Sequence, residues 1–219
     1  MADRPARITV IAGVNGAGKS SILGAALRDA GGVYYNPDEE ARRLLETGGA
    51  RDPDEANAKA WEMGREALER AIEERLNFNF ETTLGGRTIT GLLRRASEAG
   101  LEVWMFYVGL SSPALYEARV QVRVSRGGHD IPHDRIVERF DTSRKNLVRL
   151  LPYLARLRMF DNSRDADPAE GKMPEPIEVL SIDHGRMVYC CPMDQVPEWA
   201  RPVVAAALRT FRPRGLGGP

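Results

Sequence analysis

The glycine-rich stretch Gly13-Val14-Asn15-Gly16-Ala17-Gly18-Lys19-Ser20 constrains this chain more than any other. An apolar, β-branched run, Ile8–Ala12, precedes it, and apolar residues at helical spacing predict a helix over residues 18–30. A buried strand that passes through G-x-x-x-x-G-K-S into a helix is typical of the phosphate-binding loop (P-loop) of nucleoside triphosphate-binding proteins. The backbone N–H groups of such a loop and the helix dipole behind it attract a triphosphate.

The loop predicts both a nucleotide site and a metal ligand. Lys19 is expected to reach the β- and γ-phosphates of ATP or GTP, and Ser20 is expected to hold Mg²⁺. No Asn-Lys-x-Asp segment for reading guanine is present in the sequence. A chance glycine-rich turn is the alternative interpretation. The residues expected to bind the nucleotide in and beside the loop are Gly13, Asn15, Gly16, Ala17, Gly18, Lys19, Ser20 and Ser21.

Composition excludes several classes of function. The 31 basic and 31 acidic residues balance, which gives no reason to expect nucleic acid or an anionic membrane as a partner. No apolar run approaches the ~18 residues of a membrane span, and the N-terminus lacks a signal-peptide core, so a cytoplasmic protein is expected. Cys190 and Cys191 are adjacent and suggest neither a disulfide framework nor a zinc site.

Apolar runs alternate with helical patterns and predict an α/β protein with the P-loop NTPase fold. We expect a parallel sheet of about five strands with helices on both faces, plus a C-terminal β-hairpin and helix. The run 101–110 is expected to be buried on both faces. A helix over 53–76 is expected to bury Trp61, Leu68, Ile72 and Leu76. The expected divisions are a P-loop core over 1–165 with a helical lid at about 112–150, a hairpin and helix over 166–211 packed on the core, and a disordered tail over 212–219.

Polar groups directly after the predicted strands are candidate site residues, because ligands bind at the carboxyl ends of parallel strands. Asp38 follows the second strand, and Glu81-Thr82-Thr83 follows the third. A phosphotransferase needs a carboxylate that accepts the proton of the attacking hydroxyl and often another that orders Mg²⁺. Asp38 and Glu81 are placed to divide these roles. The alternatives are a helix-capping role for Asp38 and a solvated strand end for Glu81.

Arginines at helical spacing predict a basic surface above the loop. Arg119, Arg123 and Arg126 share one face of a helix expected from Ser112, with Leu115, Ala118 and Val122 on another face. Arg135 and Arg139 form a second pair on the following helix, and His129 lies in the turn between the two helices. Guanidinium groups suit phosphate oxygens, so these stripes favour a lid over the triphosphate. A solvated helix face is the alternative.

Together these motifs resemble the zeta-toxin family of small P-loop kinases over about residues 7–165. The resemblance rests on the loop, on Asn36-Pro37-Asp38-Glu39, on Phe80-Glu81-Thr82-Thr83-Leu84 and on the stretch from Arg119 to Asn146 with Gly127-Gly128-His129. It implies phosphorylation of the 3′-hydroxyl of the amino sugar in UDP-N-acetylglucosamine with ATP and Mg²⁺, and restraint by a small antitoxin protein.

The resemblance also implies residue roles. By this resemblance, Asp38 is the general base, and Lys19 and Ser20 are the phosphate and Mg²⁺ ligands. Glu81 and Thr83, with Thr82 beside them, are groups on the substrate or metal side. Arg119 or Arg123 serves as the first of two phosphate-stabilising arginines of the lid. At the second position this chain has Gly-Gly-His, so His129, Arg126 or Arg135 is expected to substitute. The alternative function is a regulatory ATPase that acts through a protein partner; only a kinase requires a carboxylate in a second pocket beyond the γ-phosphate.

Overall fold

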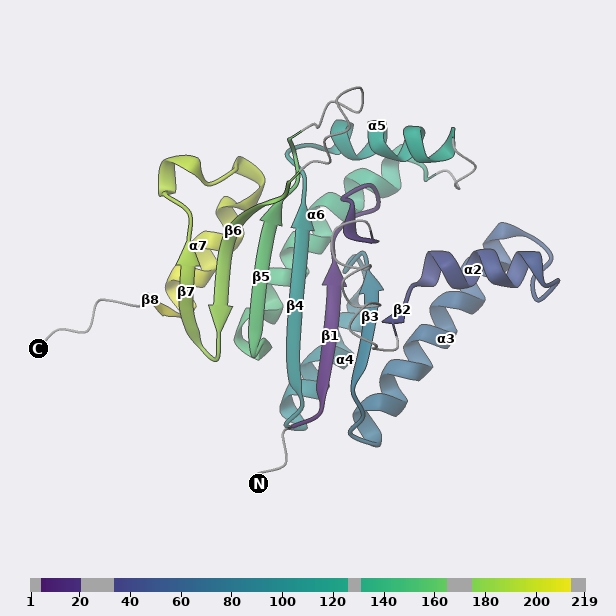
Figure 1. Ribbon diagram of the computed structural model, residues 1–219, viewed down its shortest axis with the longest axis horizontal. Coiled ribbons are helices and arrows are strands. Elements are labelled where there is room, and N and C mark those ends of the chain that lie inside the picture. The colour runs from purple at the N-terminus through teal and green to yellow at the C-terminus, as the bar shows by residue number, and fades with distance from the viewer. Residues whose placement is uncertain (1–4, 21–33, 126–130, 165–174, 214–219) are drawn as a thin grey trace, which may run out of the picture.

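The computed structural model describes residues 5–20, 34–125, 131–164 and 175–213. Strands and helices alternate through most of this range (Figure 1). The strands are β1 (Arg7–Ala12), β2 (Tyr34–Tyr35), β3 (Phe78–Thr82), β4 (Glu102–Gly109), β5 (Arg156–Asp161), β6 (Ile177–Asp183), β7 (Arg186–Cys190) and β8 (Arg212–Pro213). The α-helices are α2 (Pro37–Glu46), α3 (Pro53–Glu73), α4 (Arg87–Glu98), α5 (Pro113–Val124), α6 (His133–Leu150) and α7 (Arg201–Thr210).

All eight strands form one sheet in the order β2-β3-β1-β4-β5-β6-β7-β8. The first five strands in this order are parallel, and β1 lies between β3 and β4, with Val10 opposite Phe80 on one side and Met105 on the other. The α/β, P-loop NTPase-type class is therefore confirmed. The sheet has more strands than expected because the hairpin β6–β7 continues it antiparallel along the β5 edge, and β8 adds to β7.

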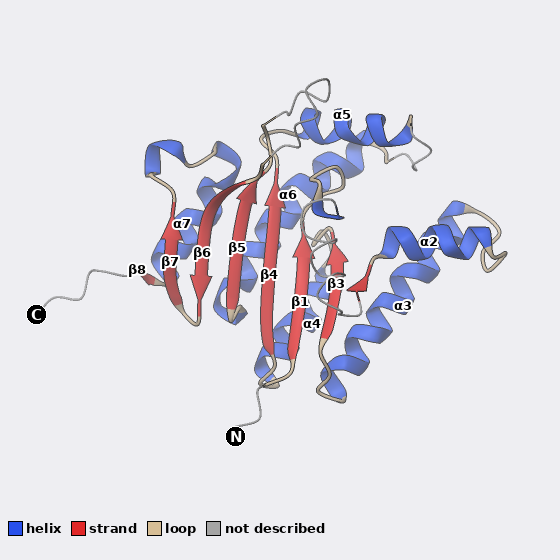
Figure 2. Cartoon of the chain, in the orientation of Figure 1, coloured by secondary structure: helices blue, strands red, loops and turns tan. Residues whose placement is uncertain are grey.

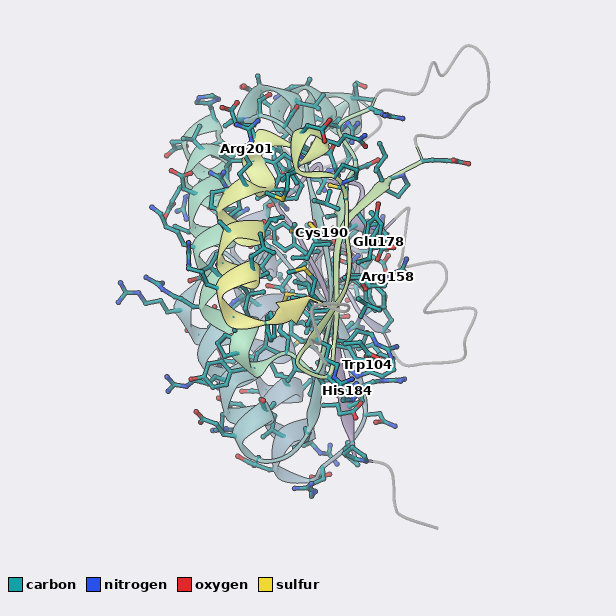
Figure 3. All side chains as sticks on the ribbon, turned by 90° about the vertical axis from the view of Figure 1, so that its left-hand side faces the viewer. Trp104, Arg158, Glu178, His184, Cys190 and Arg201 are labelled. Atoms are coloured by element: carbon teal, nitrogen blue, oxygen red, sulfur yellow. The ribbon has the colours of Figure 1, made fainter. Side chains whose placement is uncertain are left out.

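The helices α4, α6 and α7 pack on one face of the sheet, α2 and α3 lie at its β2 end, and α5 lies over the carboxyl ends of the strands (Figure 1). In Figure 3, α7 lies on one side of the sheet, while Arg158 and Glu178 project from the other. Figure 2 shows α2 and α3 beyond β2. The second helical layer expected from the sequence depends on the helix over 18–30, and residues 21–33 lie outside the described range. No helix among the described residues has the length and apolar character that membrane crossing requires.

The strand β4 differs from the expectation of burial on both faces. Val103, Met105 and Tyr107 are buried toward the helices, whereas Trp104 and Phe106, on the opposite face, are only half-buried. Burial is complete only near the carboxyl end of the strand, where Val108 and Leu110 pack against the P-loop in a separate core cluster. One long apolar run in the sequence does not distinguish a strand buried on both faces from a strand buried on one face.

The region expected as a lid is divided between two cores. The helix α5 and the start of α6 pack on the P-loop through Tyr116, Val120 and Ile136. Leu147 and Leu150, in the second half of α6, belong instead to the main core behind the sheet. The buried face of α5 also differs from the predicted one: Tyr116 and Val120 are buried, while Ala118 is exposed and Val122 is 52% exposed.

Several element boundaries differ from the expected ones. The strand β3 extends to Thr82, so Glu81 lies within it rather than after it. The helix α3 ends at Glu73, because Arg75 adopts a positive φ of 53°. Two short 3₁₀ turns, Met193–Gln195 and Glu198–Ala200, precede α7. The expected tail begins with the strand β8, and residues 214–219 lie outside the described range.

Candidate active site

The P-loop leaves β1 at its carboxyl end and is fixed on both sides by neighbouring backbone. The amide of Gly13 donates to the carbonyl of Thr82 at 3.2 Å. A Cβ atom on Gly13 would lie 2.2 Å from the carbonyl oxygen of Val108, and one on Gly16 would lie 2.7 Å from that of Tyr116. Both glycines also have positive φ. Side chains are therefore excluded at these positions, where the loop turns between β4 and α5.

Lys19, Ser20 and Glu81 form one buried polar cluster beside the loop. The Lys19 Nζ lies 3.3 Å from Glu81 Oε1 and also donates to the carbonyl of Val14 at 3.3 Å. The Ser20 hydroxyl donates to Glu81 Oε2 at 2.9 Å. Lys19 is 6% exposed and Glu81 is 8% exposed, so the carboxylate is not the solvated strand end of the alternative interpretation. The structure brings together both residues predicted to bind the metal.

A hydroxyl and a carboxamide from the β2 end hold the Glu81 carboxylate. The Tyr34 hydroxyl donates to Glu81 Oε2 at 2.5 Å, and Asn36 Nδ2 lies 3.4 Å from the same oxygen. Asn36 Oδ1 accepts from the backbone N–H groups of Asp38 and Glu39, which makes Asn36 the N-cap of α2. One side chain thus fixes both the start of α2 and the orientation of Glu81.

Asp38 lies in the first turn of α2 and faces α5. Arg123 Nη1 contacts its Oδ2 at 3.2 Å, across 85 residues of sequence. Because the N-cap role belongs to Asn36, the Asp38 carboxylate does not cap the helix. Arg119, on the same face of α5 as Arg123, donates to the backbone carbonyl of Arg164 at 3.4 Å. The structure therefore brings Arg123, but not Arg119, to the predicted base.

Arg139 reaches the P-loop from α6. Its Nη1 donates to Asn15 Oδ1 at 2.7 Å, and Asn15 is buried. Burial, followed by repulsion from Arg135, lowers the pKa of the Arg139 guanidinium from its usual value. The helical spacing of Arg135 and Arg139 was visible in the sequence, but the expected substitutes for the second arginine of the lid were Arg135, Arg126 and His129. Ser21, Arg126 and His129 lie outside the described residues.

A cavity of about 680 Å³ lies next to these groups. Lys19 and Glu81 border it on the loop side, Asp38 at α2, and Arg135 and Arg139 at α6. Thr82 and Thr83 also line it; the Thr82 hydroxyl accepts from the amide of Leu84 at 3.1 Å, which stabilises the turn after β3. The helix α3 forms another wall of the cavity, with Asp54, Asn57, Trp61 and Arg65.

Trp61 was placed incorrectly from the sequence, which predicted a buried stripe containing Trp61, Leu68, Ile72 and Leu76. Leu68 and Ile72 are buried, but Trp61 and Leu76 are each 45% exposed. The buried positions of α3 nearest to Trp61 are the small residues Ala56 and Ala60. Small residues carry a weak hydrophobic signal, so the periodicity of the larger residues indicated the wrong face for the first half of the helix.

Asn162 is a further residue beside the P-loop, and it was not among the predicted site residues. Its Nδ2 donates to the carbonyl of Ala17 in the P-loop at 2.9 Å, and its backbone amide donates to Gly109 at 3.0 Å. The residue is 3% exposed. It therefore ties the loop to the ends of both β4 and β5.

The Ser20 hydroxyl and the Glu81 carboxylate fit a magnesium ion. Both present oxygen atoms, the ligand type that Mg²⁺ prefers, and they lie 2.9 Å apart beside the phosphate-binding loop. Elsewhere in the described ranges, no group of three or more histidine, cysteine, aspartate or glutamate side chains has the arrangement of a metal site. Chemically, the arrangement offers a phosphate cradle, a cation ligand set and a carboxylate facing one cavity.

The chain is similar in sequence to a known protein family over most of its length. The model of a family described as Zeta toxin matches residues 2–166. An uncharacterised protein of Haemophilus influenzae is 30% identical over 131 residues, which cover 58% of this chain and 88% of that protein.

Solved structures show the same fold. The complex AvrRxo1-ORF1:-ORF2 with ATP matches with a TM-score of 0.65 and 16% identity, over 98% of this chain and 66% of that chain. This chain thus spans about two thirds of the AvrRxo1 chain's length. The PezAT chromosomal toxin–antitoxin system of Streptococcus pneumoniae matches with a TM-score of 0.52 and 16% identity, over 80% of this chain and 76% of that chain.

Proposed function

The chain belongs to the zeta toxin family, and from that premise we propose that it is an ATP- and Mg²⁺-dependent kinase. The acceptor in this proposal is a hydroxyl group of UDP-N-acetylglucosamine or a related nucleotide sugar. A nucleotide-dependent, kinase-type activity is the part that family membership supports directly. The acceptor rests on the resemblance of the motifs together with the cavity.

One observation carries the proposal: Lys19 and Glu81 of the nucleotide site and the Asp38 carboxylate all line the same cavity of about 680 Å³. A regulatory ATPase needs only a water molecule near the γ-phosphate. A kinase needs room for a second substrate between the phosphate-binding groups and a base. The size of the cavity and the position of Asp38 on its wall favour the kinase.

The proposed reaction is a direct transfer. The acceptor oxygen forms a bond to the γ-phosphorus while the bond from that phosphorus to the β–γ bridging oxygen breaks, and ADP leaves. Asp38 takes the proton of the acceptor hydroxyl. Arg123 holds Asp38 in the structure, so it has to release the carboxylate as the phosphate arrives. Lys19 and Arg139, at the loop, balance negative charge on the transferring group.

Ser20 and Glu81 are the residues that would hold Mg²⁺. When bound, the ion supplies neutralisation of the triphosphate charge. In the structure, Lys19 and Ser20 each contact one of the two oxygens of Glu81. The contribution of the chain is to orient that carboxylate, through Tyr34 and Asn36.

We also propose a small antitoxin protein as a partner. The PezAT match is to a toxin–antitoxin system, and the AvrRxo1-ORF1 match is to a complex with ORF2. A co-expressed antitoxin that forms a complex with this chain and lowers its kinase activity would support this part.

The kinase proposal is tested by incubating the full chain with ATP, Mg²⁺ and a panel of nucleotide sugars, with mass spectrometry as the readout. The expected result is a product of one nucleotide sugar that is heavier by one phosphoryl group. The Lys19→Ala variant serves as the control and should form no product, because the loop loses its phosphate-binding cation. ATP turnover to ADP alone, with no phosphorylated acceptor in a broad panel of nucleotide sugars, would instead favour the regulatory ATPase.

A further inference from the structure

The wall that α3 gives to the cavity differs in chemistry from the opposite wall. Positions 54, 57, 61 and 65, at helical spacing, all line the cavity. The cation on this wall, Arg65, is already held: its Nη1 contacts Glu69 at 2.5 Å, and Glu62 binds the same guanidinium. The α6 wall carries Arg135 and Arg139, and among the described residues neither forms an ion pair. The α6 wall therefore suits an anion, whereas the α3 wall offers it no unpaired cation.

Trp61 is the largest aromatic group on the α3 wall, and its ring is available. It is 45% exposed although it sits in the middle of a 21-residue helix packed on the sheet. Asn57 lies one helical turn earlier on the same face, and within the described ranges no side chain holds its carboxamide. A flat ring surface and a free carboxamide that both donates and accepts hydrogen bonds therefore lie side by side.

The backbone beneath Trp61 is held firmly. The Tyr35 hydroxyl donates to the carbonyl of Ala60, and burial raises the pKa of Tyr35 to about 12, so the donor proton is retained. A Cβ atom at Gly64 would lie 2.6 Å from the Tyr35 ring. A glycine in the interior of a helix is unfavourable by itself, and here it lets Tyr35 pack directly against α3. This contact positions Trp61 before any ligand arrives.

We propose that Trp61 and Asn57 form a subsite for the heterocyclic base of a nucleotide-type acceptor. The base stacks on the Trp61 ring, and the Asn57 carboxamide pairs with a base edge that carries a neighbouring donor and acceptor. The phosphates of the acceptor then face Arg135, and its sugar hydroxyl faces Asp38. This inference rests on the proposed kinase function, because it assigns the cavity to the acceptor rather than to ATP.

The test compares two probes that differ only in the base: UDP-N-acetylglucosamine and its analogue that carries hydrogen in place of the base at C1′ of the ribose. Their dissociation constants are measured by calorimetry with the full chain, saturated with a non-hydrolysable ATP analogue. Trp61→Ala should weaken binding of the base-containing probe by roughly 5- to 100-fold, the range expected for loss of one stacked base. Trp61→Phe keeps an aromatic face and should lose less, and Asn57→Ala should weaken the same probe. The probe without a base should change by less than about 2-fold in every variant.

Equal losses for both probes would overturn the inference, because the tryptophan would then contact the sugar. Unchanged binding of the base-containing probe in Trp61→Ala would overturn it as well. Circular dichroism and the affinity for the ATP analogue show whether each variant is folded, and Trp61→Phe provides a folded variant in any case. A probe that binds through Trp61 but is never phosphorylated would contradict the proposed kinase function while leaving the base subsite in place.

Discussion

At the scale of single residues, Asp38 separates a kinase from other uses of the nucleotide site. Its carboxylate lines the cavity. Among the described residues, its one ion pair is with Arg123 of α5. The Asp38→Asn variant should keep its affinity for ATP and lose at least ~10²-fold in the rate of phosphoryl transfer, the usual scale of general-base catalysis. The measurement is single-turnover transfer beside ATP binding by calorimetry.

The matched control for Asp38 is Asp54→Asn. Asp54 lines the same cavity but lies in the first turn of α3, away from Arg123. We expect this variant to retain transfer within a few-fold of the original protein. Transfer that survives in Asp38→Asn would mean that another group accepts the proton.

A second prediction at the scale of single residues concerns the role of Arg139 in phosphoryl transfer. Its guanidinium contacts Asn15 of the P-loop and is partly buried, so it should act on the phosphate during transfer. Arg139→Gln should reduce kcat by about 10²- to 10³-fold, as expected for the loss of one preorganised donor, with a smaller effect on ATP affinity. The exposed Arg135, one turn earlier, provides the comparison: Arg135→Gln should affect KM for the acceptor more than kcat. A loss confined to ATP affinity in Arg139→Gln would reduce its role to nucleotide binding.

At the scale of the elements, Gly64 and Gly91, both in the interior of a described helix, lead to opposite predictions. Replacing a helix-interior glycine by alanine normally stabilises a protein by about 0.5–1 kcal/mol. Gly91→Ala in α4 should do so, because no atom lies within 4 Å of the new Cβ. Gly64→Ala should instead destabilise by about 1–3 kcal/mol, because the Cβ would lie 2.6 Å from the Tyr35 ring. Urea unfolding of the two variants measures the difference, and stabilisation by both would show that Tyr35 moves aside freely.

The helices and strands also show which parts of the structure can be predicted from local sequence patterns. The P-loop and the C-terminal hairpin depend on local patterns, and these elements were predicted correctly. The alignment of Arg139 with Asn15, 124 residues away, depends on how α6 crosses the sheet, which no local pattern contains. Trp61 was misplaced because alanines bury the helix face beside it. The predicted lid, at about 112–150, includes the second half of α6. That half packs in the main core behind the sheet, whereas the start of α6 packs on the P-loop.

At the scale of the whole molecule, the sheet joins the C-terminal region to the nucleotide site. The strand β6 runs along β5, and Trp199, before α7, packs over Gly109 and donates to Asp161 Oδ1 at 2.9 Å. Asp161 directly precedes Asn162, which holds the P-loop. The expected division of the chain at residue 165 therefore runs through a continuous sheet. A kinase core without residues 175–213 would expose the β5 edge and lose the Trp199 contact.

The far end of the same sheet carries a pH-dependent contact between β4 and the β6–β7 turn. His184 Nε2 lies 3.2 Å from Glu102 Oε1, and its Nδ1 lies 3.0 Å from Asp183 Oδ1; Figure 3 shows His184 beside Trp104. The Glu102 carboxylate, followed by Asp183, raises the pKa of His184 above its usual value of 6.5. A raised pKa in the folded state means that the stabilisation is complete below the unfolded pKa and is lost as the pH rises through the folded pKa.

This contact gives a prediction for the stability of the whole molecule. His184→Asn removes the titrating group and still tolerates the positive φ of 44° at this turn. The variant should melt at a lower temperature than the original protein at pH 6, and the difference should shrink as the pH rises to about 8.5. Because His184 is largely exposed, the effect should also weaken in high salt. A difference in Tm that is independent of pH would assign the loss to the turn geometry rather than to the charge on His184.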